Sequence, residues 1–329
     1  MGKKDLYQSD FYENHKRFSD VFNGIFFGGQ EVMKPEELEE VDSVMVSLAK
    51  DGGRKKIICD KVRKWKGKYV SIMVLENQSY VDYQMVLRAM RTELLGYERQ
   101  QRKAFEEAKT RGIQFDGHEY LSRMKREQKF IPVITLVLYM GTKGHWDGAR
   151  SLHELLELED GLKPFVSNYK LNLYDYHEYQ DFSIFKTENR ALFETLSCAN
   201  DESRMEEALK RHPDWYSALD EESAKAIFGI TGIRINLETI REVTEKGKEV
   251  FNVCKAFDDH MERGRREGKK EGRAEGRKEG RAEGRKEGRI EGKKEAVKNL
   301  MRNLSVSLEQ AMELLGISEE ERDKYLSVD

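Results

Sequence analysis

Two carboxylates lie close to the ends of two short apolar segments in the first quarter of the chain. Asp60 falls within residues 57–62, and Glu76 directly follows residues 69–75. Both segments are rich in the β-branched and aromatic residues that favour strands. Residues 64–68, between the two segments, are polar with a central glycine, which predicts a short turn. We therefore expect two neighbouring antiparallel strands that bring the two carboxylates together.

This pair has the chemistry of a metal site. Carboxylate oxygens are the ligands that Mg²⁺ prefers, so Asp60 and Glu76 are candidate ligands for Mg²⁺, or for Mn²⁺ in its place. The backbone carbonyl of Asn77 is a third candidate ligand. Side chains two residues apart on a strand point to the same side, which places Gln78 beside Glu76. We expect Gln78 to orient an attacking water, and Asp60, Glu76 and Gln78 to form the catalytic group.

The same spacing also has a simpler interpretation. Many unrelated chains contain an aspartate and, further along, a Glu-x-Gln sequence, and acidic residues at strand ends are often only solvated. The apolar run 71–75 favours a metal, because it should be buried and it leads directly into Glu76. Burying a carboxylate without a partner is costly, and a bound cation offsets that cost.

Further strands and helices are expected around this hairpin. Residues 131–140 form a continuous apolar run, typical of a strand buried on both faces, and the alternation in residues 169–174 predicts a strand nearer an edge. Apolar spacing predicts a helix over residues 11–28, and Asp82 is the expected N-cap of a long helix ending near Lys109. Together they predict an α/β fold with a mixed sheet flanked by helices.

Several longer motifs resemble one known family in their order and spacing. The chain is similar to the Rpn family of recombination-promoting nucleases, whose members are also described as transposases, within the PD-(D/E)XK nuclease superfamily. The motifs are RFSDVFNGIFFGG (17–29), LENQSYVDYQMVLRAM (75–90), PVITLVLYMGTKGHWDGARSLHELL (132–156), NYKLNLYDY (168–176) and the repetitive tail.

The resemblance implies a restriction-endonuclease-like core and a metal-dependent endonuclease that hydrolyses DNA phosphodiester bonds, linked to recombination or mobile elements. It also implies that Asp60 and Glu76 hold the metal. Gln78 stands where the wider superfamily usually has lysine, and Cys59 stands where relatives often carry arginine or serine. A nuclease-like protein with a degenerate site, which binds DNA or assembles with partners, is the alternative.

Two secondary candidates also rest on the resemblance. Asp20 lies on the predicted helix 11–28, where an acidic residue of the family can lie near the metal; an exposed aspartate is the alternative. Arg88, near the start of the helix after Asp82, is a candidate phosphate contact, or else an ordinary salt-bridged arginine. His145, Trp146 and Asp147 are interpreted as a packed turn rather than as a catalytic group.

The chain is expected to divide into four parts. These are a nuclease domain (1–186), a helical extension (187–260) that ends in a helix over residues 233–257, a low-complexity charged repeat (261–296) and a small helical appendage (297–329).

In the repeat, glycine recurs every four residues from Gly264 to Gly292. Eight glycines cost a helix about 8 kcal/mol relative to alanine, and ion pairs return only about 0.2–0.5 kcal/mol each. We therefore expect disorder in the lone chain. The regular spacing of small residues also suits close packing of helices, so a flexible tether and self-association through residues 262–295 remain alternatives.

Composition restricts the function classes. Residues 262–295 hold 14 Lys and Arg and 9 Asp and Glu, a net charge of +5, which leaves 44 basic and 52 acidic residues elsewhere. No apolar run reaches the ~20 residues of a membrane span, and residues 1–10 are too polar for a signal peptide. We expect a cytoplasmic protein with DNA as its partner and no membrane. The three cysteines form no C-x-x-C pair, and the seven histidines show no ligand spacing.

Overall fold

The computed structural model describes residues 10–318 and 321–322, apart from residues 42–43, 49–53, 59–60, 68–69, 200 and 232–235. The chain forms two compact units, Met1–Phe257 and Asp258–Asp329.

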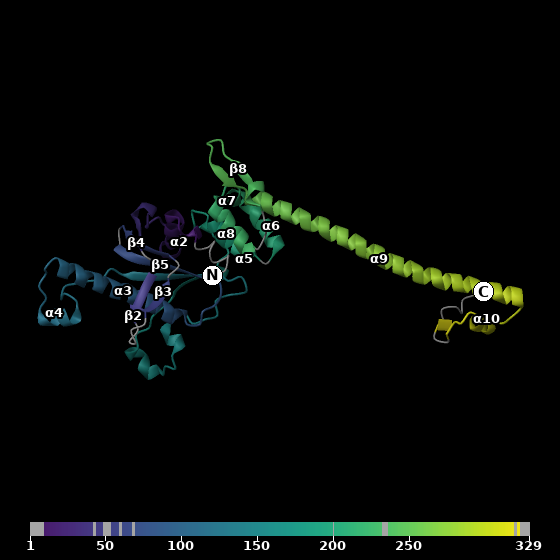
Figure 1. The fold of residues 1–329 in the computed structure, drawn as a ribbon, viewed down its shortest axis with the longest axis horizontal. Helices are drawn as coiled ribbons and strands as arrows, with labels where there is room; N and C mark the ends of the chain where they lie inside the picture. The colour runs from purple at the N-terminus through teal and green to yellow at the C-terminus, as the bar shows by residue number, and fades with distance from the viewer. Residues whose placement is uncertain are drawn as a thin grey trace. The chain divides into compact units, whose positions relative to one another are not determined.

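A five-stranded mixed sheet forms the centre of the first unit (Figure 1). β4 pairs antiparallel with β1 and with β5, whereas β5 and β6 are parallel, as are β6 and β7. In spatial order, the strands are β1 (Leu38–Glu40), β4 (Lys61–Lys66), β5 (Val70–Gln78), β6 (Val133–Tyr139) and β7 (Asn172–Asp175). The expected mixed α/β architecture is confirmed, with β6 in the interior and β7 at an edge.

Helices cover both faces of this sheet. Leu136 and Leu138 of β6 lie in a core with α2 (His15–Phe27) and α5 (Asn189–Cys198). The alternate residue Val137 packs with residues of α3 (Met85–Thr110). Because side chains alternate along a strand, this division buries β6 on both faces, as its continuous apolar sequence predicts.

The two predicted flanking helices differ in how well their ends agree with the sequence analysis. α2 ends as expected: Gly28 follows it at φ 61°, the left-handed conformation that glycine adopts at low cost. The predicted N-cap of α3 is wrong. Gln84 is its N-cap. The Asp82 carboxylate instead accepts the N–H of Gln84 at 2.9 Å, which forms a turn over residues 82–84, directly before the helix.

The predicted hairpin forms with different bounds. β3 (Arg54–Ile58) pairs with β2 (Val44–Leu48) in a separate two-stranded sheet, and it is β4, beginning at Lys61, that pairs with β5. The predicted turn over residues 64–68 is wrong for residues 64–66, because β4 continues to Lys66. Trp65 explains the difference: its side chain is buried, and its indole N–H donates to the Glu37 carboxylate at 2.8 Å.

Residues 187–257 pack into the same core as the sheet instead of forming a separate layer. The predicted helix over residues 233–257 is wrong for residues 236–252, which include the hairpin β8–β9 with a turn at Gly247 (φ 76°), whereas residues 253–257 are helical. The elements are α6 (Glu202–Arg211), α7 (Pro213–Tyr216), α8 (Glu221–Thr231), β8 (Arg241–Val243) and β9 (Glu249–Phe251).

The charged repeat is helical. α9 (Val253–Leu304) is a single helix of 52 residues that contains all eight glycines of the repeat (Figure 1). The expected disorder of this segment is therefore wrong. α10 (Leu308–Leu314) packs against the C-terminal part of α9 through Val297, Ala311 and Met312, within the segment predicted to be a small helical appendage.

Short 3₁₀ helices connect several of these elements, at Pro35–Glu37, Leu152–Leu155, Asp160–Phe165, Tyr176–Glu178 and Leu237–Thr239; α4 is a short helix at Gly117–Ser122. Among the described helices, none combines the length and the apolar character that a membrane span needs.

Candidate functional site

The carboxyl ends of β5, β6 and β7 lie together at one end of the sheet, because these three strands are parallel. We call this end of the sheet the carboxyl edge. Gln78 pairs with Tyr139, and Tyr139 pairs in turn with Asp175. Laterally paired residues project to the same face of a sheet, and Tyr139 packs on the α3 side. Ligands of open α/β sheets bind outside the carboxyl ends of the strands. A functional site is therefore expected at this edge.

The predicted metal ligands are close to this edge in sequence. Asp60 lies outside the described residues, and of Glu76 only the backbone is described: it lies in β5 and pairs with Val137. Lys61, which follows Asp60, pairs with Leu75, which precedes Glu76. The antiparallel ladder between β4 and β5 therefore ends next to both predicted ligands.

The other two members of the predicted site lie at the end of β5. Asn77, whose backbone carbonyl is a candidate ligand, pairs with Leu138. Gln78 is buried, with 3% of its surface exposed, and its backbone carbonyl accepts the N–H of Met140 at 2.7 Å. Gln78 is thus a fixed part of the sheet edge, on the same face as Tyr139.

The cations beside Asp60 are themselves paired. Lys61 and Arg63 of β4 have side chains that are about nine-tenths buried or more, and both contact the Glu13 carboxylate. Burial alone would raise the pKa of Glu13, but the hydrogen bonds and charges of these two cations lower it overall. Arg63 also lies 3.8 Å from the Glu40 carboxylate, so both buried cations have acidic partners.

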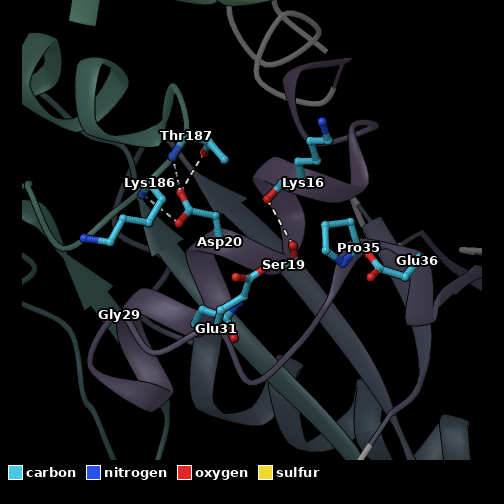
Figure 2. A pocket seen from close by; sticks show the side chains of 10 residues that line it. Lys16, Ser19, Asp20, Gly29, Glu31, Pro35, Glu36, Lys186 and Thr187 are labelled. Atoms are coloured by element: carbon cyan, nitrogen blue, oxygen red, sulfur yellow. Dashed lines mark hydrogen bonds between the residues drawn. The ribbon is translucent and has the colours of Figure 1, made fainter.

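Asp20 makes a set of structural hydrogen bonds on α2. Its carboxylate accepts the backbone N–H groups of Lys186 (2.8 Å) and Thr187 (3.0 Å), the Thr187 hydroxyl (2.6 Å) and the Asn189 amide (3.0 Å). Figure 2 shows the carboxylate turned toward Lys186 and Thr187, at the wall of a cavity of about 320 Å³ that Lys16 also lines. These four donors account for the burial of Asp20 without a cation.

Arg88 lies in the first turn of α3. Its guanidinium is 3.7 Å from the Asp82 carboxylate, and its side chain is one-third exposed. This contact is the salt-bridged alternative considered for Arg88.

A group of side chains that the sequence analysis did not connect lies at the end of β7. His145, Asp175 and His177 each offer a potential metal-ligand atom, and these atoms lie within 4.8 Å of one another. Trp146 is buried against Tyr139, with ring centroids 5.5 Å apart, so the packed turn predicted for residues 145–147 is present. The same turn carries the His145 imidazole toward Asp175.

Tyr139 lies beside this group. Burial, followed by the negative charges of Asp175 and Asp147, raises the pKa of the Tyr139 phenol. The phenol therefore stays protonated at neutral pH and is a hydrogen-bond donor, not an anion, at this edge of the sheet.

Comparison with known proteins identifies one family. The family described as "Putative transposase, YhgA-like" matches residues 61–226, about half of the chain, from the start of β4 to α8. No curated protein and no solved structure matches the chain.

Proposed function

The chain belongs to the YhgA-like transposase family, which is of the PD-(D/E)XK and Rpn type, and from that premise we propose that it is a metal-dependent DNA endonuclease. Its core would be restriction-endonuclease-like, and its substrate would be a DNA phosphodiester bond. The family description also suggests a role connected with mobile elements or recombination.

The observation that carries this proposal is the register of β4 and β5. Their antiparallel ladder ends at Lys61 and Leu75, the neighbours of the two carboxylates that the family pattern requires. β5 then continues through Glu76 and Asn77 to Gln78, alongside the parallel strand β6. Ligands of open α/β sheets bind outside the carboxyl ends of the strands, which supports a substrate position beside the ends of β5 and β6.

The donor set suits a hard divalent cation. Asp60, Glu76 and the Asn77 carbonyl would supply only oxygen atoms, which is the preference of Mg²⁺ and also suits Mn²⁺. When bound, such a cation lowers the pKa of water and stabilises negative charge on a phosphate. The chain's own contribution is positional: Gln78, fixed in the sheet edge, would orient the attacking water.

A plasmid-nicking assay with and without Mg²⁺ tests the proposal. The variants Asp60→Asn and Glu76→Gln keep the size of each side chain but remove the charge that the cation needs, so we expect cleavage to fall at least about 100-fold. Glu127→Gln, at an exposed position, is the matched control and should cleave normally. Circular dichroism would verify that each variant is folded.

Two results would contradict this assignment in different ways. Cleavage by Asp60→Asn and Glu76→Gln at the wild-type rate would remove both residues from the site. Tight DNA binding by the wild-type chain, without cleavage in Mg²⁺ or Mn²⁺, would favour the alternative of a degenerate nuclease-like protein that binds DNA or assembles with partners.

A further inference from the structure

A second group of potential ligands lies at the end of β7, separate from the acidic pair. Asp175 is the last residue of β7, His177 follows in the 3₁₀ turn Tyr176–Glu178, and His145 belongs to the loop after β6. The two imidazole centroids are 5.1 Å apart. His177 Nδ1 lies 2.7 Å from Asp175 Oδ1, and His145 Nδ1 lies 3.6 Å from Oδ2.

The carboxylate at the centre of this group is rigidly held. The Asp175 side chain has no exposed surface. Its Oδ2 atom accepts the backbone N–H of Trp146 at 2.8 Å, and its Oδ1 atom accepts the backbone N–H of His177 at 3.1 Å. Both donors belong to the segments that carry the histidines, so the carboxylate fixes the positions of both imidazoles relative to itself.

The two imidazoles differ in exposure. The His177 side chain is 18% exposed, whereas the His145 side chain is 65% exposed. The group is therefore buried on the Asp175 side and open to solvent on the His145 side. A cation held here would keep positions for water or for a ligand, as metal sites with three protein ligands do.

We propose that His145, Asp175 and His177 form a binding site for a divalent transition metal of the Zn²⁺ class. Two imidazole nitrogens and one carboxylate oxygen form a donor set that suits Zn²⁺ and its neighbours in the first transition row. The proposed ligands Asp60 and Glu76 would offer oxygen atoms only and would prefer Mg²⁺. The two sites thus differ in the metal that they select.

The second site is also separate in space. Gln78 and Asp175 both pair with Tyr139, from opposite sides, because β6 lies between β5 and β7. Strands two positions apart in a sheet are about 10 Å apart. Binding at the β7 site therefore does not depend on the nuclease proposal, and each can fail without the other.

Metal binding by the full-length chain without a polyhistidine tag tests this inference. After treatment with a chelator, the protein would be titrated with Zn²⁺, and bound metal would be measured by equilibrium dialysis and mass spectrometry. His177→Gln and His145→Gln should each weaken binding at the site at least about 10-fold, because each removes a ligand. Glutamine at either position is not expected to prevent folding, since Asp175 keeps its two backbone donors.

Two controls separate this site from others on the chain. His118→Gln changes an exposed histidine of α4 and should bind Zn²⁺ as the wild type does. Glu76→Gln should also bind Zn²⁺ at this site normally, even if it abolishes cleavage. Zn²⁺ should raise the melting temperature of the wild type and of both controls, but not that of the double variant at His145 and His177.

Equal stoichiometry and affinity in the wild type and in the double variant would overturn the proposal and leave Asp175 and His177 as a hydrogen-bonded pair only. Co²⁺ provides a second criterion. Cys198 and Cys254 are not in disulfides, so a sulphur-to-cobalt charge-transfer band is possible. If such a band persists in the double variant, it would assign the bound metal to cysteine and overturn the proposal as well.

Discussion

At the scale of single residues, Glu93 shows how a buried carboxyl connects a helix to the sheet. It lies on α3, and its Oε1 atom accepts the backbone N–H of Thr135 in β6 at 3.0 Å and the Tyr169 hydroxyl at 2.9 Å. Burial raises the pKa of Glu93, and the hydrogen bonds that it accepts compensate only in part. The carboxyl is therefore easier to protonate in the folded chain than in the unfolded chain.

This raised pKa predicts the pH dependence of the variant Glu93→Gln. Because the pKa of Glu93 is higher in the folded chain than the unfolded value of about 4.3, its protonation stabilises the folded chain, and this contribution is complete below the unfolded pKa. The contribution is lost as the pH rises through the folded-state pKa. Glutamine keeps an acceptor oxygen without the charge, so the variant should be more stable than the wild type at pH 7. The difference in the free energy of unfolding, measured with urea, should shrink toward pH 4. A difference that grows on acidification would show that the sign is wrong.

Gln78 provides the residue-scale prediction for the proposed nuclease. Gln78→Lys should keep or raise cleavage, because lysine takes this place in the wider superfamily and can stabilise developing negative charge. Gln78→Leu, which has a similar size but no polar group, should lower the nicking rate about 100-fold. Normal cleavage by Gln78→Leu in an otherwise folded chain would leave Gln78 with no catalytic part.

The sequence alone relates Glu76 to Gln78 but does not connect His145 with Asp175 and His177. Glu76 and Gln78 lie together on one strand, so alternation along β5 was enough to relate them. His145 and Asp175 come from different segments, and only the parallel pairing of β6 with β7 brings them together. The local pattern at residues 145–147 correctly predicted a packed turn. It could not show that Asp175, at the end of a neighbouring strand, would lie beside that turn.

At the scale of elements, the errors follow from tertiary contacts that override local propensity. Lysines and a glycine around Trp65 predicted a turn, but burial of the indole and its hydrogen bond to Glu37 hold this residue in β4. The connection to β5 instead begins only at Gly67, where a Cβ atom would collide with the Glu37 carboxylate and the Trp65 indole. The existence and pairing of the two strands were predictable, whereas their ends were not.

Asp20 connects α2 to the segment that leads into α5, and this contact predicts a structural phenotype. Asp20→Ala would leave the backbone N–H groups of Lys186 and Thr187 without their acceptor, at a cost of about 3 kcal/mol in the free energy of unfolding. Asp20→Asn keeps one acceptor oxygen and should cost less. Below the melting temperature, cleavage by both variants should match the wild type. Unchanged stability with lost cleavage would instead place Asp20 at the metal.

The repeat helix α9 is the element whose propensity and structure disagree most. Its glycines do weaken it, but the helix is anchored at both ends. Val253 and Phe257 are buried in the core of the first unit, and Val297 is buried against α10. Helix nucleation is the costly step, so two packed ends favour propagation through a segment that would not form a helix alone. The sum of the helix propensities of the repeat residues does not include the stabilisation that comes from these packed ends.

Replacing glycines of the repeat with alanine measures how much these glycines destabilise α9. A Cβ atom added at Gly276, Gly280 or Gly284 would meet no other atom within 4 Å. The triple alanine variant should therefore stabilise α9 by about 3 kcal/mol in total, which hydrogen exchange of its amides would detect as slower exchange. Gly28→Ala is the contrasting control and should destabilise α2, because Gly28 has φ 61°. Unchanged exchange in the triple variant would mean that the glycines do not limit this helix.

At the scale of the whole molecule, a basic segment begins shortly after the boundary between the two units. The segment 262–295 carries a net charge of +5, in a chain whose overall net charge is −3. The start of the repeat was predictable from composition and lies close to the boundary after Phe257. The boundary expected at residue 186 rested on a change from strands to helices, and no break in the core marks it, because those helices pack on the sheet.

This division predicts the effect of removing residues 262–329. The shortened chain keeps the buried first turn of α9, including Phe257, so the first unit should fold and cleave DNA as the full-length chain does. Each basic residue that contacts DNA contributes about 0.9 to the slope of log binding constant against log salt concentration. If five basic residues of the segment 262–295 contact DNA, a number equal to its excess of basic over acidic residues, their loss should make the slope shallower by about 4.5, as measured by fluorescence anisotropy with a labelled duplex.

A full-length variant separates charge from length in this experiment. Replacing five Lys or Arg residues between positions 263 and 294 with glutamine removes the excess charge while keeping the helix, because glutamine is also a good helix former. If charge is what the tail contributes, this variant should show the same shallow slope as the truncation. An unchanged slope in both would mean that the tail does not contact DNA, and a change in mass by light scattering for the truncation alone would assign the tail to self-association.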